Sequence, residues 1–201
     1  MANFYGEFDT DKYIKETFFN SENYKGTMIE VGAGPTTFYS MSKHFRESGW
    51  RCICIEPNPK FVKQHLNEGN EIHQLACSNF EGKSIFNIVS THWAEDINGI
   101  SYSGLDVKYP INTENIEKIE VEVIKLDTLL SKLDVQNFDF VSVDVEGSEM
   151  EVIEGLNLKK YKPKVILLEN YEHNPLYVPF MEDRGYVLHK KIEYNYIFSL
   201  K

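Results

Sequence analysis

Two carboxylates follow an apolar stretch in the second half of the chain. Asp144 and Glu146 end a run rich in Val and Phe (138–145), and a glycine and Ser148 then open a helical pattern. Acids at the end of a buried strand are costly to desolvate unless they face a cleft. In open α/β sheets, this edge is where ligands bind. Acids near a helix start can also serve as caps, so ligand binding and capping both stay open for this pair.

A glycine-containing turn follows an earlier apolar strand. Residues 27–31 run into Gly32, Ala33 and Gly34, with Glu30 beside the turn. The two glycines permit a tight turn and a close approach to a ligand, or serve packing alone. The third glycine of a dinucleotide fingerprint is missing, and an acid here would repel a pyrophosphate. The turn therefore suits the cationic methionyl end of S-adenosylmethionine better than NAD.

The next two strands end in residues suited to a nucleoside. The strand at 51–55 runs into Glu56 and Pro57. An acid there, somewhat more than about 20 residues after the glycines, is placed to bind a ribose diol. The third strand runs into Ala76 and Cys77, whose small side chains can border an adenine.

Methyl transfer from S-adenosylmethionine to a hydroxyl group requires removal of the hydroxyl proton. A bound metal ion is one way to lower the pKa of that acceptor hydroxyl. Asp144 ends one predicted strand, and Glu169 and Asn170 end the next. Three oxygen ligands on adjacent strand ends suit Mg²⁺ or Mn²⁺, as in methyltransferases of the catechol O-methyltransferase type. The alternative is that Glu169 and Asn170 only terminate the strand and its turn.

A histidine that acts as general base is the other way to remove the proton of the acceptor hydroxyl. His173 lies just past the fifth core strand, and His92 lies in a long irregular connection at 91–117. Either imidazole can accept a proton near neutral pH, although a single loop histidine is often only solvated. So long an unpatterned connection is usually functional or mobile, and we expect this one over the substrate cleft.

Strand and helix patterns alternate along the chain and predict the fold. The last two strand-like runs are too close in sequence for a crossover helix, so we expect an antiparallel hairpin. We predict an α/β class I methyltransferase Rossmann-like fold with a mostly parallel seven-stranded sheet. Helices are predicted at 10–19, 35–48, 58–66 and 148–156, and strands at 27–31, 51–55, 72–75, 84–89, 119–125, 138–145, 164–168, 186–190 and 194–200.

These motifs together resemble the FkbM family of S-adenosylmethionine-dependent methyltransferases, over about residues 27–170. The resemblance implies a hydroxyl acceptor on a sugar, glycan or polyketide-like small molecule. The chain departs from the family pattern at Glu30 and at Gly34-Pro35, and Ser142 stands where Lys is common. The resemblance is carried by residues 144–149 and 152–156, 126–130, 30–34, and Glu56 with Pro57.

Composition limits the class of protein and its partners. The chain has 201 residues and a formal net charge of −10, which predicts one domain (1–201) and disfavours nucleic acid and anionic membranes as partners. No segment has the pattern of a signal peptide or membrane span. The three cysteines lack zinc-ligand spacing, and their odd number fits a reducing compartment, so we expect a cytoplasmic protein.

Three functions are consistent with these features of the sequence. The leading one is an O-methyltransferase acting on a sugar hydroxyl, because Trp93, Tyr102 and Tyr109 in the long connection can stack on a pyranose. The others are an NAD-dependent oxidoreductase and a non-catalytic Rossmann-like binding module. The acids at three strand ends favour the enzyme.

Overall fold

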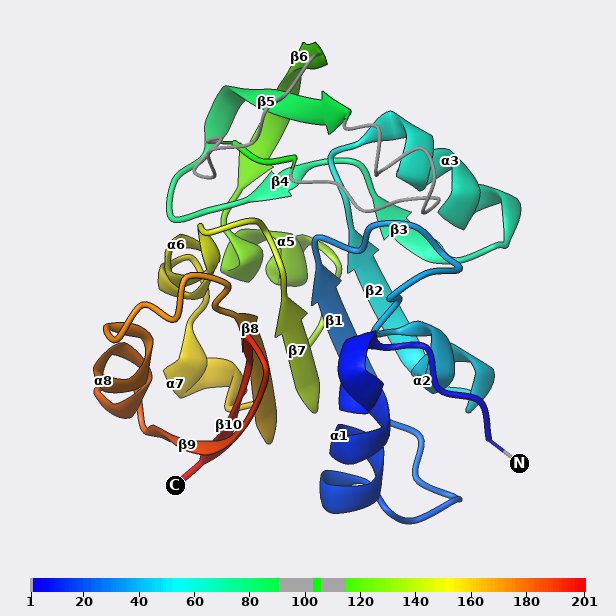
Figure 1. Cartoon of the computed structure of the whole chain (residues 1–201), viewed down its shortest axis with the longest axis vertical. Helices are drawn as coiled ribbons and strands as arrows, with labels where there is room; N and C mark the ends of the chain where they lie inside the picture. Colours follow the sequence, from blue (N-terminus) through cyan, green and yellow to red (C-terminus); the bar gives the residue numbers. More distant parts are fainter. Residues whose placement is uncertain (1, 91–102, 106–114) are drawn as a thin grey trace.

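The structure, a computed structural model, describes residues 2–90, 103–105 and 115–201 (Figure 1). Its helices are η1 (Glu7–Asp9, 3₁₀), α1 (Thr10–Phe18), α2 (Lys43–Glu47), α3 (Pro59–Asn67), α5 (Leu126–Lys132), α6 (Glu149–Glu154), α7 (Leu158–Tyr161) and α8 (Tyr177–Glu182). Its strands are β1 (Thr27–Val31), β2 (Arg51–Ile55), β3 (Glu71–His73), β4 (Ala76–Cys77), β5 (Gly82–Ser90), β6 (Asn115–Ile124), β7 (Phe140–Val143), β8 (Val165–Glu169), β9 (Tyr186–Ile192) and β10 (Asn195–Leu200).

The main sheet has the order β3-β2-β1-β7-β8-β10-β9. Its first five strands are parallel, and β10 runs antiparallel to both β8 and β9. This confirms the predicted class I methyltransferase fold and its C-terminal hairpin. Because β1, β2, β7 and β8 are parallel, the residues after their carboxyl ends lie along one edge of the sheet.

Each face of the sheet buries its own layer of helices. Alternate residues of a strand point to opposite faces, so Ile29 belongs to the core cluster that includes residues of α5 to α8, and Met28 to the cluster that includes residues of α1 and α2. Both side chains are fully buried. Burial on both faces explains why the central strands read as continuous apolar runs.

A second, three-stranded sheet of order β4-β6-β5 was not predicted. Figure 1 shows it beyond the carboxyl ends of the parallel strands. The chain leaves the main sheet at His73, whose carbonyl accepts from the Leu75 N–H, and Ala76 and Cys77 then pair with β6. The predicted strand at 72–75 is therefore wrong at its end, because pairing partners distant in sequence set its limits.

The predicted helix at 35–48 is also wrong in length, since α2 covers only Lys43–Glu47. Tyr39, inside the predicted range, has φ 53°, a left-handed angle that a continuous α-helix excludes. The segment before α2 instead contributes residues to the cavity described below. No helix in the described part of the chain is long and apolar enough to span a membrane.

Candidate functional site

A cavity of about 220 Å³ lies at the carboxyl ends of β1, β2, β7 and β8. Phe86 and the described residues 103–105 close it from the side of the second sheet. All of the predicted cofactor residues line it: Glu30, Gly32, Ala33, Gly34, Glu56, Pro57, Ala76, Cys77 and Asp144. The sequence motifs therefore converge on one space.

The two glycines of the turn have different tasks. The N–H groups of Gly32 and Ala33 both donate to the Ile55 carbonyl, at 3.0 and 3.1 Å. Gly32 has φ 79°, and a Cβ there would lie 1.6 Å from the Asp144 carbonyl oxygen, so its close approach is to the protein's own backbone. Gly34 has φ 55°, and a Cβ there would meet no atom within 4 Å. Gly34 is thus the glycine that leaves open space in the cavity.

Glu56 is held in place by backbone groups. Its Oε1 accepts from the Asn58 N–H at 2.7 Å, and its Oε2 accepts from the Gly34 N–H at 2.9 Å. Burial raises the pKa of Glu56 to about 7. Each oxygen keeps a second lone pair, so a ribose hydroxyl can still donate to it. The open space at Gly34 and this carboxylate together fit the ribose of the predicted cofactor.

Glu30 is buried and hydrogen-bonded within the protein, which the sequence did not predict. It is 3% exposed, and its carboxylate accepts from both the backbone N–H and the hydroxyl of Ser42. Arg46 donates to the same hydroxyl. Glu30 therefore anchors the start of α2, although it also lines the cavity.

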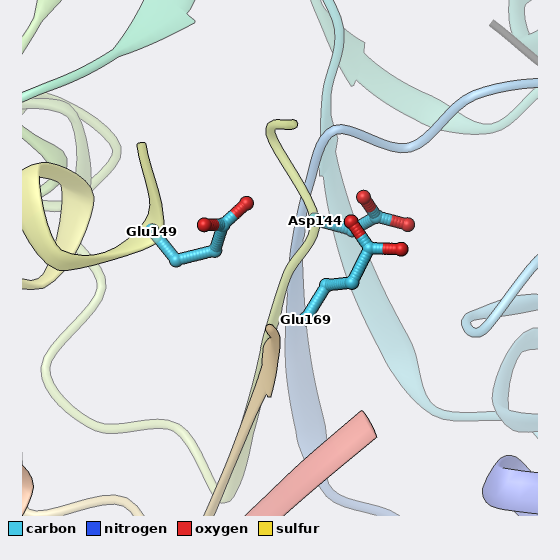
Figure 2. A group of neighbouring side chains, drawn as sticks. All are labelled: Asp144, Glu149 and Glu169. Carbon is cyan, nitrogen blue, oxygen red and sulfur yellow. The ribbon is translucent and has the colours of Figure 1, made fainter. Parts of the chain in front are cut away.

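Asp144 and Glu169 bring two carboxyl groups together at the tips of β7 and β8. Figure 2 shows Glu149 extending toward them from the start of α6, and one oxygen from each of the three lies within 4.8 Å of the others. Asp144 is accessible through the cavity, yet the surrounding protein raises its pKa to about 7, and a hydrogen bond with Glu169 opposes the rise. Burial, then the charge of Asp144, raises the pKa of Glu169.

The predicted metal ligands are not all brought together. Asn170 uses both polar side-chain atoms on the backbone of Asn174, at 3.0 and 2.8 Å. Glu149, instead of Asn170, lies beside Asp144 and Glu169. Its Oε1, however, already accepts from the Val145 and Gly147 N–H groups, at 3.0 and 2.9 Å. Its Oε2 accepts from the Tyr177 hydroxyl at 2.5 Å. Glu149 thus holds the loop at 145–147, and the predicted metal set does not fit this arrangement.

Of the two predicted histidine bases, only His173 lies among the described residues, and it lies outside the cavity. His173 is exposed, and its Nδ1 lies 3.3 Å from the Tyr196 hydroxyl. It is absent from the described residues that line the cavity. His92 lies outside the described residues, as do Trp93, Tyr102 and Tyr109. Among the described residues, Asp144 at the end of β7 lines the cavity and is a candidate proton acceptor.

Several residues that line the cavity were not predicted from the sequence. Tyr171 lies two residues after the end of β8, so its position pointed to the site. Glu7 and Tyr194 gave no such signal, because one lies before the first predicted helix and the other at the start of the last predicted strand, away from the ends of the parallel strands. The Tyr194 hydroxyl donates to Glu7 at 2.5 Å, and both line the cavity.

Solved structures with a similar fold are methyltransferases of varied substrates. Precorrin-6y C5,15-methyltransferase from Geobacter metallireducens GS-15 is 15% identical with a TM-score of 0.47, over 99% of this chain and 93% of that one. The T. thermophilus 16S rRNA N2 G1207 methyltransferase is 13% identical with a TM-score of 0.50, over 94% and 41%. The ribosomal protein L11 methylase from Lactobacillus delbrueckii subsp. bulgaricus is 10% identical with a TM-score of 0.45, over 98% and 80%.

The family is shown by a sequence model rather than by these distant folds. No curated protein matches the chain. The model of the methyltransferase FkbM domain matches residues 30–188, which run from Glu30 beside the glycine turn to β9. The match includes Glu56, Asp144 and Glu169, the acids at the ends of three parallel strands. The chain therefore belongs to the FkbM family of S-adenosylmethionine-dependent methyltransferases.

Proposed function

We propose that the protein transfers the methyl group of S-adenosylmethionine to a hydroxyl group of a sugar or glycan. The observation that carries this proposal is the Asp144 carboxylate inside the cavity, with its pKa raised to about 7. A carboxylate poised near neutral pH accepts a hydroxyl proton more effectively than an ordinary aspartate. With His173 outside the cavity, Asp144 is the described group best placed for this task.

We assign a separate role in the reaction to each of three acidic residues. When bound, S-adenosylmethionine supplies a methyl carbon on a sulfonium, whose C–S electron pair stays on sulfur as the acceptor oxygen bonds to the carbon. Glu56 and the space at Gly34 would hold its ribose, and Asp144 takes the proton from the acceptor hydroxyl. Glu169, beside Asp144 at the tip of β8, orients the Asp144 carboxyl group through their hydrogen bond. Orienting the acceptor contributes further to the rate.

A sugar is favoured as acceptor by the aromatic rings of the cavity. Phe38 and Tyr39, with ring centroids 3.9 Å apart, line one part of it. Tyr171 and Tyr194, 5.4 Å apart, line another. An aromatic face with a nearby hydroxyl suits the apolar face and hydroxyl groups of a pyranose.

The test is methyl transfer to a panel of methyl glycosides from S-adenosylmethionine that carries ¹³C in its methyl group. We expect a methoxy signal in the NMR spectrum of the product. Asp144→Asn should lower the rate by roughly 10² to 10⁴, the usual worth of general base catalysis, and should change affinity for S-adenosylhomocysteine less. His173→Ala should leave the rate unchanged. Methyl found only on nitrogen or carbon, or a full rate in Asp144→Asn, would show that the proposal is wrong.

A further inference from the structure

The backbone of Gly34 is held on both sides by side chains from other parts of the chain. Its N–H donates to the Oε2 atom of Glu56 at 2.9 Å. Its carbonyl oxygen lies 3.1 Å from the Nε2 atom of His65, which belongs to α3. Gly34 has φ 55°, and with no side chain it has no packing of its own to fix that angle. The two contacts therefore restrict the shape of the turn where the cavity is open.

The His65 ring can make its contact with Gly34 only as a donor. A carbonyl oxygen carries no hydrogen, so the proton must lie on Nε2. The side chain is 0% exposed, and burial lowers the pKa of His65 below its ordinary value of 6.5, so the ring is mainly neutral at pH 7 and has one N–H. Its Nδ1 is then an acceptor, and the Nδ2 atom of Asn70 lies 3.3 Å from it. Asn70 thus favours the tautomer that donates to Gly34.

The way α3 ends explains why Asn70 lies beside His65, five positions earlier. The helix ends at Asn67, and Gly69 follows with φ 71°, a left-handed angle that suits glycine. The Gly69 N–H donates to the Leu66 carbonyl at 3.1 Å, and the Asn70 N–H donates to the His65 carbonyl at 3.0 Å. This pair of hydrogen bonds is a Schellman motif, which folds the chain back onto the last turn of the helix.

The start of α3 holds the other side of the same turn. Asn58 is the N-cap residue of this helix, and its N–H donates to the Oε1 atom of Glu56 at 2.7 Å. Glu56 in turn accepts from Gly34. Past the glycine, the Thr36 hydroxyl donates to Glu68, the C-cap residue of α3, at 2.5 Å. Both ends of α3 therefore hold the turn.

We propose that His65 is a positioning residue for the cofactor, whose Nε2–H holds the Gly34 carbonyl so that the turn is already shaped for S-adenosylmethionine before it binds. This inference rests on the cofactor half of the proposed function and does not depend on the acceptor. A glycine turn without this restraint would lose conformational freedom on binding, and the cofactor would bind more weakly. His65 is absent from the described residues that line the cavity, so it acts through Gly34.

A purely structural role is the alternative, because a buried histidine can simply fill space between α3 and the turn. Two amide substitutions separate these roles, since they differ in reach. The amide nitrogen of a glutamine lies near the place of a histidine Nε2, whereas that of an asparagine lies near the place of Nδ1. His65→Gln can therefore still donate to Gly34, and His65→Asn cannot.

The test measures affinity for S-adenosylhomocysteine by calorimetry at neutral pH. We expect His65→Asn to bind about tenfold more weakly, the effect of one lost hydrogen bond. His65→Gln should recover most of this affinity. Ile166→Val removes a buried methylene from β8 outside the lining of the cavity, and it should lower stability without changing the affinity. Urea unfolding confirms that each variant is folded and ranks their stabilities.

The His65 ring provides a second, independent measurement. In ¹⁵N NMR spectra of histidine-labelled protein without cofactor, the signal that disappears in His65→Gln should be that of a neutral ring with its hydrogen on Nε2. A hydrogen on Nδ1, equal losses of affinity in the two amide variants, or full affinity in His65→Asn would overturn the inference. A parent that does not bind S-adenosylhomocysteine would overturn the cofactor assignment with it. A parent that binds it but methylates no glycoside would contradict the sugar hydroxyl alone.

Discussion

The buried carboxyl group of Glu56 should make the stability of this protein fall as the pH rises. Its side chain is 5% exposed, and burial raises its pKa from 4.5 to about 7. Between these two values the folded protein keeps the proton while the unfolded chain releases it. Raising the pH across this window therefore favours the unfolded state, and the loss is complete above about pH 7.

The size of the effect follows from the rise in pKa. At about 1.4 kcal/mol for each pH unit, Glu56 lowers the free energy of unfolding by about 3 kcal/mol between pH 4 and pH 8. Glu56→Gln removes this proton. A glutamine cannot accept from both the Asn58 and Gly34 N–H groups, so the variant loses stability by an amount that does not depend on pH. The slope with pH, rather than the absolute stability, is thus the quantity to measure.

Urea unfolding followed by tryptophan fluorescence at several pH values measures this slope. The parent should lose about 3 kcal/mol more than Glu56→Gln as the pH rises across the window, while Glu16→Gln on α1 should behave like the parent. A parent and a Glu56→Gln variant with the same pH dependence would refute the reasoning. A bound ribose that donates to Glu56 favours its charged form, so S-adenosylhomocysteine should raise the melting temperature more at pH 8 than at pH 5.

Two further predictions concern the backbone around the cavity. Gly32→Ala should destabilise the protein by about 4 kcal/mol or more in urea unfolding, because its Cβ would overlap the Asp144 carbonyl, whereas Gly34→Ala should cost about 1–2 kcal/mol and mainly weaken S-adenosylhomocysteine binding. Equal losses of stability in the two variants would contradict the separate tasks assigned to these glycines. Glu149→Ala should cost about 3 kcal/mol and speed amide exchange at residues 145–147, which lose their acceptor. Unchanged exchange there would show that the Glu149 carboxylate does not hold this loop.

The sequence determined the central sheet and the acids on its edge. Runs such as β1 and β7 are apolar on both faces because helices cover both, and that pattern is readable without a structure. Since parallel strands end at one edge, the residues that follow them had to meet. Glu56, Asp144 and Glu169 could therefore be placed in one cavity from their positions alone.

Only the tertiary structure decided what each polar group does at that edge. Asn170 follows β8 as predicted, but its amide closes a turn onto Asn174, and a neighbouring side chain, Glu149, reaches the carboxyl pair instead. His173 lies in the same turn, three residues after Asn170, yet its ring lies beside Tyr196 rather than in the cavity. Side-chain direction depends on the local turn, which spacing along the chain does not encode.

The second sheet and the position of Glu7 could not be predicted from the sequence, for a related reason. β4 is two residues long and exists because β6, more than one element away, pairs with it. Glu7 reaches the cavity because Tyr194, at the other end of the chain, donates to it. Contacts between residues so far apart are set by how the layers pack, whereas hydrophobic periodicity reports only on neighbours along the chain.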